Sequence, residues 1–245
     1  MNAVHELLNA HRSIRKFTDQ PIDADLLVTI LRSGQAAATS SFLQGATVIR
    51  VRNPASREKL AAFAGNQPYV QTAAEFFVLC ADLKRPGNCC VQYDKPFEGD
   101  YTEHFIIATV DVALMAQNMV VAAEAAGLGI CYIGGLRNNP REVSDLLQLP
   151  KGVYPVFGLC LGYPDQDPEC KPRLPLEVIV KEDVYSEDGD AKRIAEYDEE
   201  IREYYKKRTG GGHGICWSEQ VASLLSEKAR PHMRQFLADQ GFKMK

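Results

Sequence analysis

Apolar residues follow two patterns in the first two thirds of the chain, one typical of strands and one typical of helices. Short apolar runs predict strands at residues 46–51, 75–81, 130–133 and 153–161, and two of these, 75–81 and 153–161, are continuous enough to be buried strands. Helices are expected at residues 3–11, 24–37, 54–64 and 141–147, while residues 84–99, which contain Pro, Gly and Asn, are expected to form a loop. Such a mixture is typical of an α+β fold in which a sheet is layered with helices.

The longest apolar stretch covers residues 105–129 and could cross a membrane, because about 20 apolar residues suffice for one span. It also holds two carboxylates and two carboxamides, at Asp111, Glu124, Gln117 and Asn118. A carboxylate at bilayer depth is costly, so we expect a buried helix over residues 101–126, capped by Gly127. A helix that is apolar on nearly every face needs neighbours all round, from its own domain or from a second subunit.

The composition changes in the last third of the chain. Residues 183–207 are dense in charge and tyrosine, residues 210–212 are three glycines, and residues 217–240 predict one amphipathic helix. The segment 183–230 is too polar to hold a core of its own. We therefore expect a single domain over residues 1–182, and over residues 183–245 a C-terminal arm of the same domain that wraps around that domain or a partner subunit.

Composition and charge argue against several classes of function. The chain has 245 residues, of which 45% are hydrophobic and 24% charged, close to the globular average. A net charge of −4 argues against nucleic acid or an anionic membrane as the partner, although a local basic pocket remains possible. The seven cysteines match no zinc or C-x-x-C spacing, and residues 1–15 lack the apolar core of a signal peptide, so a cytoplasmic location is expected. A redox-active Cys89-Cys90 pair is the less favoured alternative to two small loop residues.

Two basic segments are candidates for anion binding. His11-Arg12-Ser13-Ile14-Arg15 places two guanidinium groups, an imidazole and a hydroxyl at a helix-to-loop boundary, and arginine suits phosphate or a polarised carbonyl. The alternative is a solvated surface turn. Lys171-Pro172-Arg173-Leu174-Pro175 follows a predicted strand, and its prolines stiffen the backbone from which the two basic side chains project. Either segment alone is weak evidence for a phosphate site.

The glycines of residues 127–135 do not form a dinucleotide-binding loop. Tyr132 stands where the third glycine of G-x-G-x-x-G is required, and the glycines precede a strand. The pair Gly134-Gly135 would still let backbone amides approach a flat ligand closely, with a tight turn as the alternative. No nucleophile triad, metal-ligand spacing or carboxylate couple stands out. A bound cofactor is therefore expected to carry the chemistry.

Taken together, several motifs resemble the nitroreductase superfamily, specifically its NADPH-dependent, oxygen-insensitive nitroreductase and flavin reductase group. The resemblance rests on residues 11–15, Ser40-Ser41-Phe42-Leu43-Gln44, Gly65-Asn66-Gln67, Ala116-Gln117-Asn118, residues 132–138 and residues 171–175. It extends through Tyr197-Asp198, Tyr204-Tyr205, Trp217-Ser218 and Arg230-Pro231 in the arm. Each motif alone is weak evidence for the resemblance, whereas their common order and spacing are strong evidence for it.

The resemblance implies an α+β homodimer with an antiparallel-rich central sheet flanked by helices, and an FMN in each of two pockets at the subunit interface. Carried over residue by residue, the cofactor-binding positions are His11, Arg12, Ser13, Arg15, Thr39, Ser40, Ser41, Gln67, Ile133, Gly134, Gly135, Lys171 and Arg173. Lys171 and Arg173 would clamp the phosphate. Arg15 would lie toward the flavin ring, where a cation stabilises the anionic reduced form.

The implied reaction is ping-pong transfer of a hydride from NADPH, through the flavin, to nitroaromatics, quinones or free flavin. No catalytic side chain and no metal are required. The positions implied for NADPH or substrate are Phe42, Arg208, His213 and Arg230. Three glycines stand where relatives have further basic residues, which leaves NADH as the alternative donor. Two other hypotheses are a flavin-binding or flavin-delivering protein with little turnover, and a phosphate-binding enzyme without flavin.

Overall fold

The computed structural model describes residues 2–208, 210 and 214–245, which form two compact units. The first unit contains the chain up to Pro168 together with His232–Lys245, and the second is Glu169–Pro231. The chain thus returns to the first unit at His232, inside the segment expected to be an arm.

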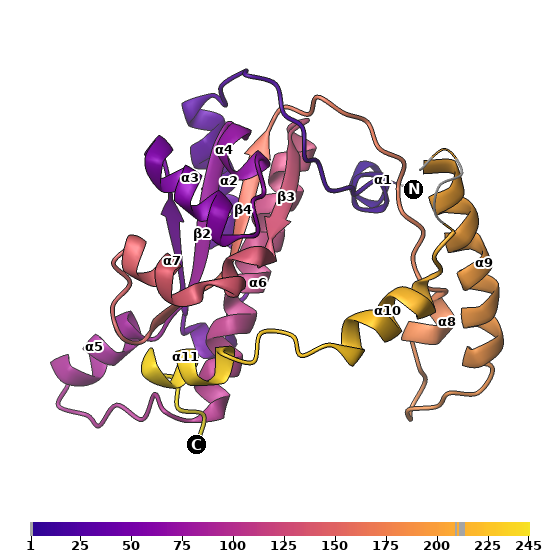
Figure 1. Ribbon diagram of the computed structural model, residues 1–245. Helices are drawn as coiled ribbons and strands as arrows, with labels where there is room; N and C mark the ends of the chain where they lie inside the picture. The colour runs from indigo at the N-terminus through magenta and orange to yellow at the C-terminus, as the bar shows by residue number, and fades with distance from the viewer. Residues whose placement is uncertain (1, 209, 211–213) are drawn as a thin grey trace. The chain divides into compact units, whose positions relative to one another are not determined.

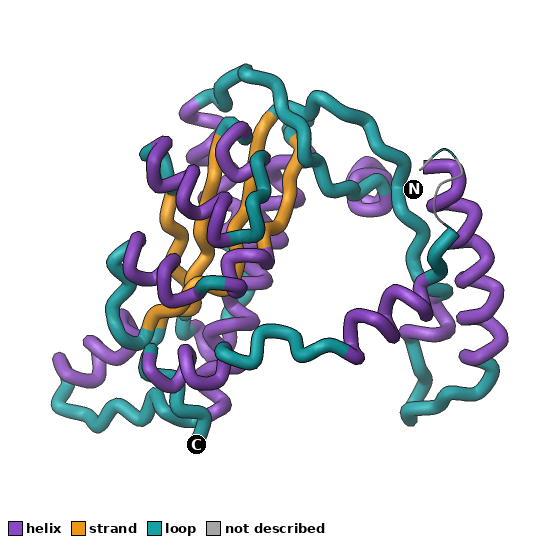
Figure 2. Tube along the Cα trace, in the orientation of Figure 1, coloured by secondary structure: helices purple, strands orange, loops and turns teal. Residues whose placement is uncertain are grey.

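The first unit is built on one four-stranded sheet with the order β1-β2-β4-β3, and every neighbouring pair is antiparallel (Figures 1 and 2). The strands are β1 (Ala46–Arg50), β2 (Glu75–Asp82), β3 (Gly129–Ile133) and β4 (Val153–Gly162). The sheet and its antiparallel pairing confirm the predicted α+β class. The register between β2 and β4 shifts at Leu79 and Cys80, opposite Pro155. A bulge there suits a proline, which cannot donate a ladder hydrogen bond.

Helices cover both faces of this sheet, because side chains alternate along the central strands. From β2, Phe77, Leu79 and Ala81 enter a core shared with α2 (Ala24–Gln35) and α6 (Thr102–Ala125). Phe76, Val78 and Cys80 point to the other face, which is covered by α3 (Pro54–Phe63), α4 (Tyr69–Thr72) and α7 (Pro140–Leu146). Continuous apolar strands therefore reflect a sheet buried on both sides.

Helix α6 is long and apolar enough to span a membrane by length and composition. It nevertheless packs on β2 and α2, and Asp111 on its buried side is only 1% exposed. We therefore interpret it as a core helix. Ile106, Val110 and Leu114 lie at i, i+4 and i+8 and are 48%, 49% and 43% exposed. Its own subunit thus supplies neighbours for only part of its surface.

The prediction of a loop over residues 84–99 was wrong, because helix α5 occupies Lys84–Gln92. Pro86 is in the first turn, where its missing N–H would have no partner within the helix, so it does not break the helix. The carboxylate of Asp82 accepts a hydrogen bond from the Arg85 N–H at 3.1 Å and holds that end. A proline breaks a helix in its interior and is tolerated in its first turn.

The prediction of one helix over residues 217–240 was also wrong. Helix α10 (Trp217–Ser226) belongs to the second unit and α11 (Met233–Asp239) to the first. Pro231 lies between them, and Arg230, the residue before it, has a φ of 50°. The ring of a proline disfavours helical backbone in the preceding residue. For this reason the apolar pattern of residues 217–240 does not form one continuous helix.

The second unit consists of α8 (Leu176–Ile179), α9 (Asp190–Arg208) and α10. Tyr197, Ile201 and Tyr204 form the buried face of α9, and the Tyr197 and Trp217 rings meet edge to face at 6.2 Å. The start of α10 is closed by a capping box in which the Cys216 Sγ accepts from the Glu219 N–H and the Glu219 carboxylate accepts from the Cys216 N–H. These contacts fold a segment that is rich in charge.

Candidate functional site

The basic segment of residues 11–15 follows helix α1 (Ala3–Asn9) and lies beside β3. Ser13 forms a parallel bridge with Ile130, and the Ile14 N–H donates to the Ile130 carbonyl at 2.8 Å. The Ile14 side chain is buried against Gly129, where an added Cβ would lie 2.6 Å from Ile14 Cγ1. Gly129 therefore lets the segment approach the sheet, and the sheet fixes the backbone from which the basic side chains project.

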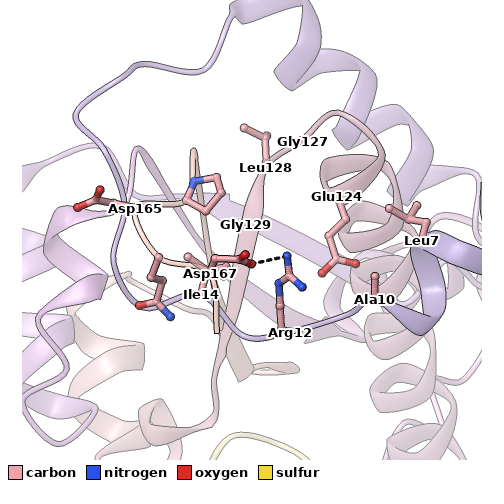
Figure 3. Close-up of a pocket in the computed structure, with 12 residues that line it drawn as sticks. Leu7, Ala10, Arg12, Ile14, Glu124, Gly127, Leu128, Gly129, Asp165 and Asp167 are labelled. Carbon is pink, nitrogen blue, oxygen red and sulfur yellow. Dashed lines mark ion pairs between the residues drawn. The ribbon is translucent and has the colours of Figure 1, made fainter. Parts of the chain in front are cut away.

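Two of the basic side chains in this segment have carboxylate partners. The His11 Nδ1 lies 2.6 Å from a Glu124 carboxylate oxygen, and the Arg12 guanidinium lies 2.6 Å from the Asp167 carboxylate. Figure 3 shows Arg12 directed toward Asp167, with Glu124 on the other side of the arginine. A cavity of about 660 Å³ adjoins these groups and is also lined by Asp165. Within the first unit, this cavity is lined by more carboxylates than cations, so it does not form a phosphate site by itself.

Arg15 belongs to a different group of polar side chains. Its guanidinium lies close enough to the Tyr69 hydroxyl to lower the pKa of that group, and the hydroxyl donates to the Gln67 carboxamide oxygen at 2.8 Å. Burial raises the pKa of Tyr69, and the arginine offsets part of this rise. The structure therefore brings Arg15 and Gln67 together, as the resemblance implies. Tyr69 joins them, and sequence reasoning missed it although it is only two residues after Gln67.

The glycine pair at the end of β3 lies beside the same group. Gly134 and Gly135 begin the short helix η2 (Gly134–Asn138), directly after Ile133. A Cβ added to Gly135 would overlap the Ala64 carbonyl oxygen and lie 2.9 Å from the Gln67 amide nitrogen. A Cβ added to Gly134 would meet only the end of the Arg137 side chain, at 3.2 Å. Gly135 is thus required by packing, and it brings the backbone close to Gln67.

Thr39, Ser40, Ser41 and Phe42 form a turn between α2 and β1 that includes the short helix η1 (Ser40–Phe42). The Phe42 side chain is 82% exposed. Among the described residues, none hydrogen-bonds to the buried Thr39 hydroxyl. A second cavity of about 660 Å³ is lined by this turn, by residues of α5 and by Phe97 and His104. An exposed aromatic ring at a cavity and a buried hydroxyl able to donate are both suited to a flat, polar-edged ligand.

The turn and the basic segment line different cavities of the first unit. They contact α6 at Asp111 and Glu124, which are 124 − 111 = 13 residues apart. At a rise of 1.5 Å per residue, these positions are about 20 Å apart along the helix. No side chain of one group can reach the other within a single chain.

Lys171 and Arg173 lie in the second unit, where they pack on α9. The Lys171 ammonium donates to the Tyr205 hydroxyl at 2.7 Å and lies 4.9 Å from the centre of the same ring. The Tyr197 hydroxyl donates to the Pro172 carbonyl at 3.0 Å. Burial raises the pKa of Tyr197, and the nearby Arg173 charge lowers it. Aromatic side chains of α9 thus hold the Lys-Pro-Arg backbone in one conformation.

Of the positions predicted for NADPH or substrate, Phe42 lies in the first unit, and Arg208 and Arg230 lie in the second. The Arg208 guanidinium donates to the Tyr204 hydroxyl at 3.1 Å, at the end of α9, and Arg230 lies near the unit's last residue. His213 lies outside the described residues. Contact of Arg208, Arg230 and His213 with the nicotinamide cofactor therefore stays a prediction.

The cysteines form no disulfide, and among the described residues no cluster of His, Cys, Asp and Glu could hold a metal ion. Burial raises the pKa of Cys80 to about 12 and also raises the pKa of the Cys131 and Cys160 thiols. Such thiols are poor nucleophiles. Cys89 is exposed on α5, in a helix where a loop was predicted.

The donors of the first unit fit one edge of a planar, hydrogen-bonding ring better than they fit an anion alone. Arg15, Tyr69 and Gln67 supply directional polar groups, and Gly135 allows close approach. The cationic Lys171-Arg173 segment of the second unit has the chemistry that a phosphate requires. This donor set fits FMN, which combines both features.

Comparison with known protein families matches almost the whole chain. A model of the nitroreductase family matches residues 8–163, and a model of the nitroreductase family C-terminal domain matches residues 171–245. The second match begins at Lys171, close to the start of the second unit at Glu169.

Individual relatives agree over their full length. The chain is 44% identical over 241 residues to an NADPH-flavin oxidoreductase of Vibrio harveyi, with 98% of each chain covered. It is 42% identical over 242 residues to an oxygen-insensitive NADPH nitroreductase of Salmonella typhimurium, with 99% of each covered. Among solved structures, NfrA1 of B. megaterium superposes with a TM-score of 0.96 at 44% identity, covering 99% of this chain and 100% of that one. The V. harveyi NADPH:FMN oxidoreductase complexed with NAD+ gives 0.91 at 43% identity and covers all of both chains.

Proposed function

The chain belongs to the nitroreductase family, and on that premise we propose that it is an FMN-dependent oxidoreductase that carries a hydride from NADPH to small electrophilic acceptors. The acceptor class is nitroaromatics, quinones or free flavin. The observation that carries the proposal is the joining of Arg15, Tyr69 and Gln67 beside Gly135, in a chain whose full-length relatives are NADPH-dependent flavin reductases and nitroreductases.

FMN, when bound, supplies two-electron chemistry at its ring. The chain's own residues bind and orient it. Arg15 and Gln67 would hold the polar edge of the ring, and the backbone at Gly134-Gly135 would lie against it. Lys171 and Arg173 would hold the phosphate, assisted by His11, Arg12 and Ser13. Displacement of Asp167 from Arg12 by the phosphate would free that guanidinium for the cofactor.

The complete pocket is proposed to form between two subunits. The basic segment and the 39–42 turn contact α6 about 20 Å apart, so a partner subunit is needed to bring Thr39, Ser40 and Ser41 of one chain to the segment of the other. Ile106, Val110 and Leu114 offer an exposed apolar row on α6 that passes the Asp111 position, and Leu114 lies between the two positions. Burial of this row in a homodimer removes it from water and gives α6 the neighbours that its sequence requires.

The donor is proposed to be NADPH. Arg208, Arg230 and His213 are the candidates for the additional phosphate, and Phe42 would face the nicotinamide or the acceptor. Arg208 is held by Tyr204, which orients a guanidinium at an exposed helix end. A cytoplasmic location is proposed because the seven cysteines form no disulfide and because the reaction consumes NADPH.

Two spectroscopic measurements test the proposal. The purified protein is expected to take up FMN and to absorb near 450 nm. Stopped-flow mixing with NADPH without oxygen is then expected to bleach this band rapidly, and a quinone is expected to restore it. Rapid bleaching excludes the alternative of a flavin-delivering protein with little turnover. A protein that takes up no FMN would contradict the proposal.

A further inference from the structure

The turn that carries Phe42 has an unusual backbone. Over residues 40–45, here called the 40–45 turn, Ser41, Phe42 and Gln44 have φ values of 49°, 58° and 54°. None is glycine, so each Cβ is crowded by the neighbouring carbonyl group. Strained backbone persists where the surrounding structure holds it, and it concentrates at functional sites. The structure shows what holds this turn.

The buried carboxylate of Asp111 grips the turn at both ends. One oxygen accepts a hydrogen bond from the Ser40 N–H at 3.0 Å, and the other accepts from the Gly45 N–H at 3.0 Å. Gly45 lies directly on α6, where an added Cβ would be 3.3 Å from the Ala108 Cα. The first and last residues of the turn are therefore tied to one side chain.

A carboxylate is energetically unfavourable at this buried position. Asp111 is 1% exposed, and among the described residues the hydrogen bonds to its carboxylate come from backbone N–H groups and not from a lysine or an arginine. A buried charge without a counter-charge is unfavourable unless its hydrogen bonds compensate for the lost water. An apolar side chain would pack between α6 and the turn without that cost, but could not accept from either N–H.

The exit of the turn is held a second time. The Gly45 carbonyl accepts from the Asp82 N–H at 2.9 Å, and the Arg85 guanidinium donates to the Gln44 carbonyl at 3.3 Å. At the entry, the contact of this kind among the described residues is the hydrogen bond from the Ser40 N–H to Asp111. The carboxylate is therefore the contact that sets the distance between the two ends, and with it the direction in which Ser41 and Phe42 project.

We propose that Asp111 is a positioning residue for the flavin and acceptor site. It touches neither ligand, and it acts by fixing the 40–45 turn, so that Ser41 and the exposed Phe42 ring are held in place before ligands bind. This inference rests on the proposed function, in which the turn contacts FMN and the acceptor. Preorganisation of this kind lowers the cost of binding because the strained turn is not formed at that moment.

The test is Asp111→Asn in the FMN-loaded enzyme. Asparagine has the same shape, but its single oxygen can accept only one of the two N–H groups while its NH2 faces the other. The KM for a quinone and the dissociation constant of FMN are expected to rise roughly tenfold, the effect of losing a hydrogen bond to a charged group. The rate constant kcat is expected to change less than KM, because the chemistry itself is untouched.

Ser144→Ala is the matched control. The Ser144 hydroxyl is 4% exposed and donates to the Pro140 carbonyl at 2.7 Å on α7, so the variant also loses one buried hydrogen bond. Its melting temperature is expected to fall, and its quinone KM and FMN affinity to stay within about twofold of wild type. A merely structural role for Asp111 would make the two variants alike in KM, and would overturn the inference.

Glycine at position 44 provides a rescue. Adding Gln44→Gly to Asp111→Asn removes the crowded Cβ at a φ of 54°, so the turn can keep its shape with a weaker clamp. Recovery of a large part of the quinone KM is expected. Gln44 is exposed, so this substitution does not change the burial of the side chain at position 111. An absence of recovery would therefore count against the inference.

If Asp111→Asn does not fold, Gly45→Ala tests the inference in its place. It leaves the carboxylate in place and forces the turn away from Ala108 by a few tenths of an ångström. A raised quinone KM supports the inference, and an unchanged KM overturns it. Failure of the proposed function is distinguishable, because wild type would then take up no FMN or would not bleach with NADPH.

Discussion

His11 and Glu124 form a hydrogen bond of 2.6 Å between residues 113 positions apart in the chain. Their side chains are 29% and 13% exposed, so the pair lies at the edge of the core. The Glu124 carboxylate accepts from the His11 Nδ1–H, which leaves Nε2 as the ring nitrogen that we propose contacts the cofactor. The pair ties the basic segment to the last turn of α6.

Replacing Glu124 by alanine is expected to weaken FMN binding roughly tenfold, because His11 loses the partner that fixes its orientation. Flavin fluorescence on titration with FMN measures this. Glu103→Ala, an exposed glutamate in the first turn of the same helix, is the control and is expected to bind as wild type does. Equal affinities in the two variants would show that the pair does not serve the cofactor.

Tyr69→Phe is expected to raise the FMN dissociation constant about fivefold, since a hydrogen bond contributes roughly 1 kcal/mol. The ring stays in place, while the hydroxyl that joins Arg15 to Gln67 is lost. Urea unfolding of the apoprotein should change little in comparison. A loss of stability with unchanged FMN affinity would assign Tyr69 to the core and not to the site.

The two adjacent glycines offer a matched pair of substitutions. Gly135→Ala should destabilise the fold by about 1–3 kcal/mol, because the new methyl group overlaps the Ala64 carbonyl and backbone must move. Gly134→Ala should cost clearly less, since only the tip of Arg137 must move. Urea unfolding of both apoproteins checks the order. The reverse order would contradict the packing described for η2.

Acid is expected to loosen the start of α10. Hydrogen bonds from the Cys216 N–H and from Arg202 lower the pKa of Glu219 below its ordinary 4.5. Burial raises the pKa of Asp198, but hydrogen bonds from Ser218 outweigh it, and that pKa is also lowered. A carboxylate with a lowered folded pKa stabilises the fold above its unfolded pKa, and this contribution is lost as the pH falls through the folded pKa.

Trp217, the single tryptophan and the first residue of α10, reports this change by fluorescence. An acid transition with a midpoint below pH 4.5 is expected in the wild-type apoprotein. It should shrink in Glu219→Gln and disappear in the double variant with Asp198→Asn. An unchanged transition in the double variant would place its origin elsewhere in the chain.

Val110→Asp should convert the proposed dimer into monomers by placing a carboxylate in the apolar row of α6. Light scattering should then give the mass of one chain, 27.2 kDa, in place of twice that value. FMN should be lost with the partner. Val91→Asp, at a position 77% exposed on α5, is the control that should remain dimeric. A wild-type monomer that retains FMN would contradict the interface pocket.

Much of the fold follows from local patterns in the sequence. The apolar runs at β2 and β4 predict strands buried on both faces because their side chains alternate between two cores. The motif order also identified the family, and with it FMN and NADPH. The errors came where a local rule depends on position: Pro86 is tolerated in a first helical turn, whereas Pro231 separates α10 from α11.

The sequence by itself determined the strands and most of the helices, the family and the residue types available for a cofactor. Only the tertiary structure decided which of these residues meet. Tyr69 joins Arg15 to Gln67, and Asp111, which in the sequence only argued against a membrane span, holds both ends of the 40–45 turn. The physical reason is that patterns of apolar residues act over a few neighbours. A hydrogen bond between Ser40 and Asp111 instead depends on how α2, β1 and α6 pack around a common core.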